Sequence, residues 1–207
     1  MKWGPVGFDL DMTLIDSRPQ VLEAFAALSV ETGVVIDLAE VDARLGLKLE
    51  DELGYWFPSC AVRGAAAVFR RHYVELAARS TTALPGAREA LAAVGAAGSR
   101  SAIITAKHEV SVMPCLRASG LTADMVFCFV HGMEKADVLR SIGASVYVGD
   151  TPADMAAGRA ADLLTIGVTT GSFGEAALTQ AGASFTMASL QAFPSWYTRI
   201  LGTPDPG

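Results

Sequence analysis

Short apolar segments alternate with helix-length segments along most of the chain, and this alternation restricts the possible folds more than any other feature. Continuous apolar runs bounded by glycine or polar residues are typical of buried strands. Such runs cover residues 6–8, 101–105, 125–130, 145–148 and 163–168. Helical patterns cover residues 86–96, 108–119, 134–142 and 152–161. Because strands that alternate with helices build right-handed βαβ units, we expect an α/β fold, a Rossmann-like parallel sheet flanked by helices.

The interval between the first apolar run and the second breaks this alternation. Residues 16–83 contain no convincing strand and show consecutive helical patterns instead. These patterns cover residues 19–31, 38–45, 49–56 and 61–78. The tripeptide Leu-Pro-Gly at residues 84–86 is typical of a turn and stands where the alternation resumes. We therefore expect two domains: a discontinuous core of residues 1–16 and 86–207, and an inserted all-helical domain of residues 17–85.

The composition excludes several classes of protein. Of the 207 residues, 51% are apolar and 18% are charged, which is typical of a compact globular chain and not of a disordered one. The formal net charge is −6 and no run of basic residues could neutralise a phosphate backbone, so we expect no nucleic-acid partner. Cys60, Cys115 and Cys128 lie far apart without a CxxC spacing, which argues against a disulfide framework or a zinc site.

No segment is typical of a membrane span or of a secretory signal. The apolar stretch near the N-terminus is interrupted at Asp9, which makes it too short for a signal peptide. No run reaches the roughly 20 apolar residues that a helix needs to cross a bilayer. We expect a cytoplasmic protein without a membrane partner, and either a monomer or a homodimer.

Two carboxylates follow the first predicted strand. Asp9 and Asp11 stand two residues apart, directly after Phe8. In extended backbone, residues two apart point to the same side, and ligands of open α/β sheets bind at the carboxyl ends of the strands. Two anions this close repel each other unless a cation or a shared proton compensates, and Mg²⁺, which prefers oxygen ligands, fits that need. An acidic turn with Thr13 as a cap is the alternative interpretation.

A second acidic sequence, GDTPAD at residues 149–154, follows another predicted strand. Thr151 as N-cap and Pro152 at the first helical position explain a helix start, and an acid is favourable in the first turn. Capping leaves Asp150 unexplained, because one cap residue is enough. We therefore predict that Asp150 is a further metal ligand. Asp154 would either contact the metal ligands without binding the ion directly, or bind the ion through a water molecule.

Thr105 and Lys135 are two further candidates at the ends of predicted elements. Thr105 closes the run 101–105, where a β-branched strand residue or an N-cap is the alternative interpretation. Lys135 lies early in the predicted helix 134–142, where a cation opposes the helix dipole. A phosphate group nearby would turn this cost into a gain, because a lysine, a hydroxyl and helix N–H groups can hold its oxygens together.

The order of these residues resembles the haloacid dehalogenase superfamily, and in particular its phosphoglycolate-phosphatase-like members, which have a helical cap after the first strand. The likeness covers nearly the whole chain. Residues 9–14 resemble the first motif of the superfamily, Thr105 the second, Lys135 the third and residues 149–154 the fourth. Met12 is a departure, because glycine is usual there. A methionine supplies the same backbone N–H, so the resemblance implies little loss of chemistry and a narrower pocket.

The resemblance implies that Asp9 is a nucleophile, which forms an aspartyl-phosphate and divides a difficult hydrolysis into two steps. It implies that Asp11 protonates the leaving alkoxide and then removes a proton from the attacking water. Mg²⁺ held by Asp9, the backbone carbonyl of Asp11 and Asp150 would offset the charge that repels an incoming phosphate. The residues implied to hold the phosphate are Met12, Thr13, Thr105, Ala106 and Lys135.

The implied activity is the hydrolysis of a small phosphomonoester metabolite similar to phosphoglycolate. An acid at position 11 favours this chemistry, since dehalogenases lack that acid and phosphonatases have a small residue there. A sugar-phosphate mutase of the β-phosphoglucomutase type stays an alternative, in which a second hydroxyl replaces water as the acceptor. Arg44 and Lys48 flank Gly46 in the cap loop that would face the core, so we rank these two first among the cations that would contact a substrate.

Two other classes of protein are weighed against an enzyme. A phospho-accepting signalling receiver also uses acids, threonine and lysine on a doubly wound sheet, but its accepting aspartate follows an internal strand and no helical insertion of this size is expected. Long-lived phosphorylation of Asp150 in place of Asp9 would favour that class. A non-catalytic binding protein on the same fold is disfavoured because every reactive position is filled.

Overall fold

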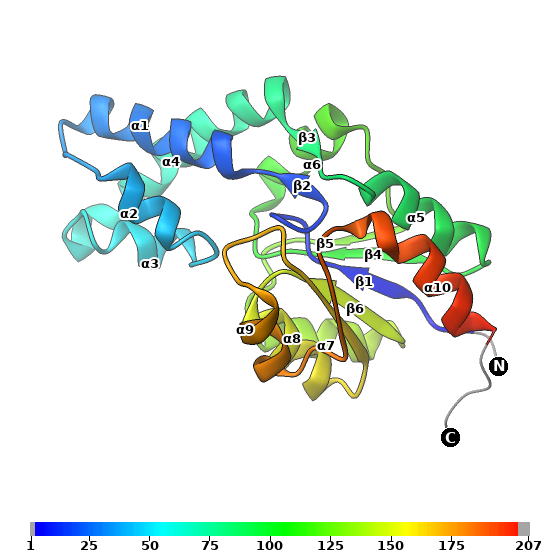
Figure 1. Cartoon of the computed structure of the whole chain (residues 1–207). Helices are drawn as coiled ribbons and strands as arrows, with labels where there is room; N and C mark the ends of the chain where they lie inside the picture. Colours follow the sequence, from blue (N-terminus) through cyan, green and yellow to red (C-terminus); the bar gives the residue numbers. More distant parts are fainter. Residues whose placement is uncertain (1–2, 203–207) are drawn as a thin grey trace.

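A parallel β-sheet forms the centre of the molecule in the computed structural model, which describes residues 3–202. Its strands lie in the order β5-β4-β1-β6-β7-β8 (Figure 1). They are β1 (Val6–Phe8), β4 (Ser101–Ile104), β5 (Met125–Phe127), β6 (Val146–Gly149), β7 (Leu164–Val168) and β8 (Phe185–Met187). Because all neighbouring pairs are parallel, the expected α/β fold is confirmed.

Strand β1 lies in the interior of the sheet because its side chains are apolar and buried on both faces. It pairs with β4 on one side and with β6 on the other, so that Phe8 stands opposite both Ile103 and Val148. An apolar run without polar alternation is typical of a strand covered on both faces. Since the three strands run in the same direction, the residues that follow them meet at one edge of the sheet.

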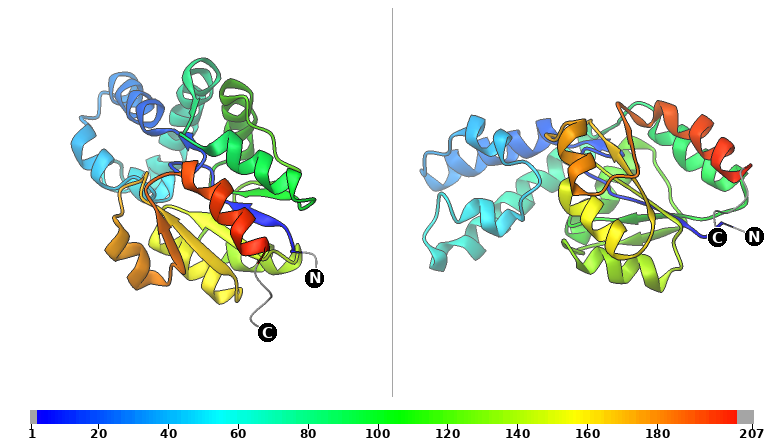
Figure 2. Two further views of the ribbon diagram at one scale, coloured as in Figure 1. Left: turned by 45° about the vertical axis from the view of Figure 1, so that its right-hand side comes forward. Right: turned by 60° about the horizontal axis from the view of Figure 1, so that its bottom comes forward.

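Helices cover both faces of the sheet (Figure 2). On one face, the ring of Phe8 lies 5.4 Å from the ring of Phe193. On the other face, Tyr147 packs with Leu139 and Ala157. Burying a large apolar side chain contributes about 1.5–3 kcal/mol, so both helical layers stabilise the sheet. The core helices are α5 (Ala87–Ala96), α6 (Glu109–Ser119), α7 (Glu134–Ser141), α8 (Pro152–Ala160), α9 (Glu175–Ala181) and α10 (Phe193–Leu201).

A group of helices extends to one side of the core, at the left of Figure 1, and we name it the helical unit. It consists of α1 (Arg18–Thr32), α2 (Leu38–Ala43), α3 (Leu49–Leu53) and α4 (Ser59–Ser80). Helices α1 and α4 pack along each other, and the rings of Phe25 and Phe69 lie 4.7 Å apart between them. Helix α1 ends at Gly33, whose left-handed φ of 70° is typical of a glycine C-cap.

Two short strands connect the helical unit to the core and correct the sequence prediction that residues 16–83 contain no strand. Strand β2 (Ile15–Asp16) pairs antiparallel with β3 (Thr82–Ala83), and Leu84 N–H donates a hydrogen bond to the Leu14 carbonyl at 2.9 Å. A strand of two residues is too short to show an alternating pattern, so the sequence offered no signal for it. The domain boundaries at residues 17 and 85 stay a prediction.

The last third of the core contains elements that the sequence did not predict, namely α9, β8 and α10. Strand β8 lies at the edge of the sheet and Phe185 is partly exposed, so its apolar pattern is weak. Two predicted elements are too long, since the helix over 49–56 ends at Leu53 and the strand over 125–130 ends at Phe127. The ends of the predicted core, residues 1–2 and 203–207, lie outside the described residues.

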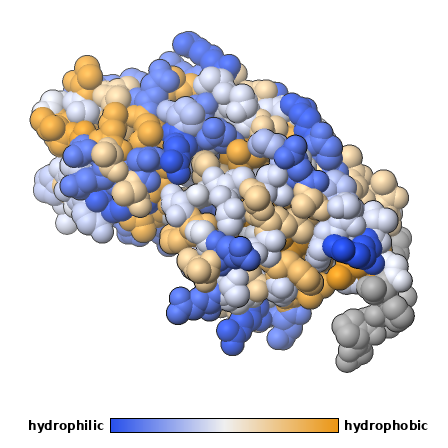
Figure 3. Space-filling model, in the orientation of Figure 1, coloured by the Kyte–Doolittle hydropathy of each residue, from blue (hydrophilic) through white to orange (hydrophobic). Residues whose placement is uncertain are grey.

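The surface shows no helix suited to a bilayer. Among residues 3–202, none of the helices is both long enough and apolar enough to span a membrane. Val30 and Val35 are the most exposed large apolar side chains of the helical unit. In Figure 3, hydrophilic side chains lie between apolar ones over the face that is shown, and scattered apolar side chains of this kind are usual on protein surfaces.

Candidate active site

Three of the predicted residues come together at the carboxyl edge of the sheet. Asp9 follows β1, Thr105 follows β4 and Asp150 follows β6, and these strands are neighbours. All three side chains are buried. The parallel sheet therefore places residues that are far apart in the sequence in one small volume.

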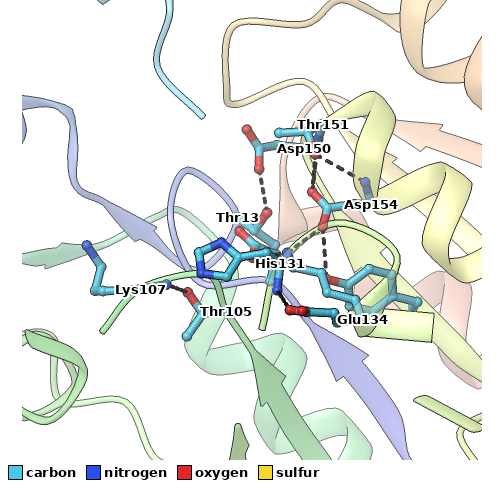
Figure 4. Close-up of polar contacts among 11 residues, drawn as sticks. Thr13, Thr105, Lys107, His131, Glu134, Asp150, Thr151 and Asp154 are labelled. Atoms are coloured by element: carbon cyan, nitrogen blue, oxygen red, sulfur yellow. Dashed lines mark hydrogen bonds and ion pairs between the residues drawn. The ribbon is translucent and has the colours of Figure 1, made fainter. Parts of the chain in front are cut away.

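Asp154 joins Asp9 and Asp150 in a group that we name the carboxylate cluster. One carboxylate oxygen from each residue lies within 4.8 Å of the others. Lys135 reaches this group from α7, with Nζ 2.7 Å from Oδ1 of Asp9 and 2.7 Å from Oδ1 of Asp154. Thr13 donates a hydrogen bond from Oγ1 to Oδ1 of Asp150 at 3.1 Å (Figure 4). Each carboxylate of the cluster is thus held by a donor from another segment.

Asp154 belongs to the carboxylate cluster and also stands in the first turn of α8. Thr151 is the N-cap of α8 and accepts a hydrogen bond from Asp154 N–H, while the Asp154 carboxylate accepts one from Thr151 N–H. This capping box fixes the start of the helix. Oδ1 of Asp154 also accepts a hydrogen bond from Tyr147 Oη at 2.9 Å. The same carboxylate therefore fixes the start of α8 and contacts the other members of the site.

Burial and the nearby charges shift the protonation of the cluster. Burial raises the pKa of Asp9 to about 7, with Lys135 opposing the shift and Asp154 adding to it. Burial and repulsion from Asp9 hold the pKa of Asp150 well above its usual range. Burial also acts to raise the pKa of Asp154, but attraction to Lys135 and hydrogen bonds outweigh it, so that this pKa is lowered.

The cluster carries more negative charge than Lys135 neutralises. Three ionised carboxylates and one ammonium leave an excess of two negative charges, and the raised pKa values of Asp9 and Asp150 express the cost of this state. A divalent cation would supply the missing charge, and carboxylate oxygens are the ligands that Mg²⁺ prefers. The residues therefore fit the magnesium ion that the sequence leads us to expect.

Asp11 lies beside the cluster, and its carboxylate faces a different cation. Oδ1 of Asp11 lies 2.9 Å from Nζ of Lys107, and Asp11 is not a member of the cluster. Lys107 was not among the predicted site residues. Its N–H donates to Oγ1 of Thr105 at 3.1 Å (Figure 4). The signal was its position, two residues after Thr105 in a loop at the functional edge of the sheet.

Two of the residues predicted to hold phosphate, Met12 and Thr13, make hydrogen bonds within the protein. Met12 adopts a left-handed φ of 56°, and its N–H donates to the Ile15 carbonyl at 2.8 Å. The N–H is thus engaged within its own loop, and the role of Met12 in holding phosphate stays a prediction. Thr13 is fully buried, and its hydroxyl supports Asp150. Met12, Thr105 and Ala106 all line the cavity of the site.

The two cations of the helical unit that were ranked together are not equivalent. Nε of Arg44 lies 2.8 Å from Glu52, its Nη1 lies 3.0 Å from Glu40, and the guanidinium covers the ring of Tyr55. Lys48 is exposed, and its ammonium has no hydrogen bond or ion pair within residues 3–202. Both residues line the cavity, Arg44 is paired with acids of the helical unit, and the contact of either cation with a substrate stays a prediction.

A cavity of about 430 Å³ separates the helical unit from the edge of the sheet. Asp9 and Lys135 form its floor, and Phe25, Phe69 and Lys48 line it from the helical unit. Volumes of roughly 300–1,000 Å³ are usual for pockets that bind small molecules. The arrangement places a buried carboxylate, a buried ammonium and a second, partly exposed carboxylate beside a space of suitable size.

Residues 6–168 match the model of the haloacid dehalogenase-like hydrolase family. The chain belongs to this family. A phosphoglycolate phosphatase of Cupriavidus necator is 28% identical over 92% of this chain and 91% of its own length. A phosphoglycolate phosphatase of Rhodospirillum rubrum is 27% identical over 97% of this chain and 91% of its own. The predicted family and its phosphoglycolate-phosphatase-like branch are confirmed.

Solved structures of the family share the fold. A haloacid dehalogenase-like hydrolase from Streptococcus pneumoniae superposes with a TM-score of 0.82 at 18% identity, covering 95% of this chain and 99% of that chain. The structure of CbbY from Rhodobacter sphaeroides, in complex with phosphate, gives a TM-score of 0.77 at 19% identity, covering 91% of this chain and 95% of that one. These likenesses agree with the fold derived from the strands above.

Proposed function

We propose that this chain is a Mg²⁺-dependent phosphatase that hydrolyses a small phosphomonoester through an aspartyl-phosphate on Asp9. The coarser statement, that it is a hydrolase of phosphoric monoesters, follows from its family and from relatives that are phosphatases by name. The observation that carries the finer proposal is the environment of Asp9, a buried carboxylate at the end of the central strand in contact with Lys135.

In the first step, a carboxylate oxygen of Asp9 forms a bond to phosphorus while the bond from phosphorus to the leaving oxygen breaks. Asp11 gives its carboxyl proton to that leaving oxygen, so the product departs as a neutral alcohol. Asp11 suits this task because it lies on the cavity wall beside the cluster and keeps contact with solvent. The covalent intermediate replaces one high barrier by two lower ones.

In the second step, Asp11 is a carboxylate and takes a proton from a water molecule. The water oxygen forms a bond to phosphorus while the bond between Asp9 and phosphorus breaks. Inorganic phosphate leaves, Asp9 is again a carboxylate and Asp11 is again an acid, so both groups are ready for another turnover.

Lys135 and Thr105 would hold the transferring phosphoryl group. An ammonium has three donors, and Lys135 uses two of them on Asp9 and Asp154. One donor is left for a phosphate oxygen. Thr105 Oγ1 accepts the hydrogen bond from Lys107 N–H, which leaves its own hydrogen free to donate. Both groups therefore have unused donors at the floor of the cavity.

Mg²⁺ would neutralise charge on the phosphate and thereby ease the approach of a carboxylate. The residues that would hold it are Asp9, Asp150 and the backbone carbonyl of Asp11. Asp154 would support the site through Lys135 and the start of α8, in agreement with its contacts. These assignments follow the ligand set that the family resemblance implies.

Residues 17–85, which include the helical unit, would form a cap domain over the site. This cap would exclude water and select substrates. The short β2-β3 pair at its junction supports a boundary there. Lys48 is the cation with which an anionic part of a substrate would pair, and the relatives make phosphoglycolate the first compound to compare with others. A cytoplasmic location and a monomer or homodimer stay predictions.

The proposal is tested by measuring inorganic phosphate released from p-nitrophenyl phosphate and from phosphoglycolate. We expect Mg²⁺-dependent release that EDTA abolishes and that Asp9→Asn lowers by roughly 10³-fold or more, since the nucleophile is lost. Phosphate release that continues in EDTA, or in Asp9→Asn at the wild-type rate, would contradict it. A mutase would transfer the phosphoryl group to a sugar phosphate without releasing phosphate, and a receiver would stay phosphorylated.

A further inference from the structure

Lys107 lies between the proposed acid and a tyrosine of the helical unit. Its Nζ is 2.9 Å from Oδ1 of Asp11, 2.8 Å from Oη of Tyr73 and 4.1 Å from the centre of the Tyr73 ring. The three residues belong to the loop after β1, the loop after β4 and helix α4. The two chemical steps described above use neither the Lys107 side chain nor Tyr73.

Lys107 is itself held in place at its backbone. Its N–H donates to Oγ1 of Thr105 at 3.1 Å, and its carbonyl accepts from Phe129 N–H at 3.0 Å. The side chain is only 10% exposed. Burial acts to lower the pKa of Lys107, but attraction to Asp11 and Tyr73 outweighs it and raises that pKa, so the ammonium stays charged. The position of the ammonium is therefore set by the core.

Tyr73 fixes the other side of this ammonium. It is fully buried in the C-terminal half of α4, which packs on α6, and its Oη lies 3.6 Å from Sγ of Cys115. Because an ammonium only donates, Oη accepts from Lys107, and the tyrosine hydrogen is left to point toward Cys115. The Tyr73 ring also stacks on Phe69 at 5.8 Å. Tyr73 thus has contacts on all sides and little freedom to move.

We propose that Lys107 is a positioning residue that fixes the carboxyl group of Asp11 for proton transfer, and that Tyr73 holds the Lys107 ammonium in place. Oδ1 of Asp11 faces a group that only donates, so the proton that Asp11 transfers is carried on Oδ2. One oxygen is anchored and the other serves the leaving group and then the water. This inference rests on the proposed role of Asp11 in the hydrolysis.

The test compares two substrates of similar size, phenyl phosphate and p-nitrophenyl phosphate. Phenolate is the poorer leaving group and needs the proton from Asp11, whereas p-nitrophenolate leaves with little help. In Lys107→Met we expect kcat/KM for phenyl phosphate to fall about tenfold more than kcat/KM for p-nitrophenyl phosphate, because misplacing a general acid affects the step that needs it. A residue with a merely structural role would lower both values equally.

A double-variant cycle shows whether Lys107 acts through Asp11. Asp11→Asn alone should give the same selective loss on phenyl phosphate, and adding Lys107→Met to it should cause no further selective loss. Tyr73→Phe keeps the ring and removes the hydroxyl, so it should give the same pattern in weaker form. Lys48→Met is the matched control, because Lys48 lies on the same cavity and has no hydrogen bond or ion pair with Asp11 or Tyr73 among residues 3–202, and it should change both substrates alike.

Equal losses on both substrates in Lys107→Met, or a selective loss that adds to that of Asp11→Asn, would overturn the inference. If Asp11→Asn hydrolyses both compounds like the wild type, the proposed function of Asp11 fails instead, and the two failures are distinct. Thermal unfolding of each variant checks that it is folded. If Lys107→Met does not fold, Tyr73→Phe decides the question, and equal losses there overturn the role of Tyr73 and the positioning of Lys107 with it.

Discussion

The ion pairs of the core site and those of the helical unit differ in how deeply they are buried. In the core, the buried Asp9 and Asp154 share the ammonium of Lys135, which comes from a distant segment. In the helical unit, several ion pairs lie at or near the surface, such as the pair of Arg44 with Glu40 one helical turn away, and the acid that is buried there, Glu52, pairs with the same Arg44. Water screens the second kind of pair more strongly than the first, whose side chains are at most 9% exposed.

The depth of burial determines how much a substitution of a charged residue should lower stability. A buried charge must have its partner, because an unpaired charge in the interior costs several kcal/mol. An exposed pair contributes little, because water solvates each partner when the other is removed. The buried Asp9, Lys135 and Asp154 should therefore tolerate almost no change of charge, and the exposed pairs of the helical unit should tolerate many.

The largest contrast is expected between Lys135→Met and Arg70→Met. The first leaves Asp9 and Asp154 buried without their ammonium, so we expect a loss of about 3–5 kcal/mol in the free energy of unfolding and roughly 10²–10³-fold in kcat. The second breaks a partly exposed pair with Glu50 and should cost about 0–1 kcal/mol. Urea unfolding and phosphate release measure both, and equal losses would contradict the comparison.

The stabilisation by Mg²⁺ should depend on the carboxylates of the core and not on those of the helical unit. At a Mg²⁺ concentration of 100 times its dissociation constant, binding should stabilise the wild type by about 2.7 kcal/mol, and EDTA should remove this gain. Asp150→Asn should lose it, because it removes a carboxylate of the cluster. Glu50→Gln in the helical unit is the control and should keep it. A Mg²⁺ effect on thermal unfolding that survives in Asp150→Asn would place the ion elsewhere.

A smaller effect is expected within the helical unit itself. Lys48 is free at the cavity, so Lys48→Met should raise KM for phosphoglycolate a few-fold with little change in kcat. Arg44 is engaged with Glu52 and Glu40, so Arg44→Met should lower the melting temperature and leave KM nearly unchanged. Steady-state kinetics and thermal unfolding distinguish the two, and the reverse pattern would show that Arg44 contacts the substrate.

The smallest effect concerns pH and an exposed pair. Hydrogen bonds from Arg71 and His72 hold the pKa of Glu31 below its usual range. A carboxyl with a lowered pKa stabilises the fold above the pKa of the unfolded state, and that contribution is lost as the pH falls through the pKa of the folded state. Glu31→Gln should therefore be slightly less stable than the wild type near pH 6, with the difference closing in acid. A difference that grows in acid would contradict this sign.

The core could be predicted from the sequence because its signals are strong and local. Apolar runs mark the buried strands, and parallel strands must bring their carboxyl ends to one edge, which places Asp9, Thr105 and Asp150 together. The partners of these residues could not be read in the same way. That Lys135 bridges Asp9 and Asp154, and that Thr13 supports Asp150, depends on side-chain packing that no spacing specifies.

In the helical unit, the helices could be predicted from the sequence but the partners of the charged side chains could not. Its helices are predicted by their periodicity, but Arg44 and Lys48 look alike in the sequence and differ in the structure. The difference arises from Glu52, a buried acid that attracts the guanidinium. Lys107 is a similar case in the core, since its role depends on Tyr73, which reaches it from a helix more than 30 residues earlier in the chain.

Trapping the phosphoryl group on the protein during turnover tests most directly whether Asp9 is the nucleophile. Enzyme mixed with ³²P-labelled substrate and Mg²⁺ would be quenched in acid within milliseconds, digested and mapped by mass spectrometry. We expect acid-stable label on Asp9 in the wild type and none in Asp9→Asn. Label on Asp150 or another residue, or rapid hydrolysis by Asp9→Asn, would contradict it.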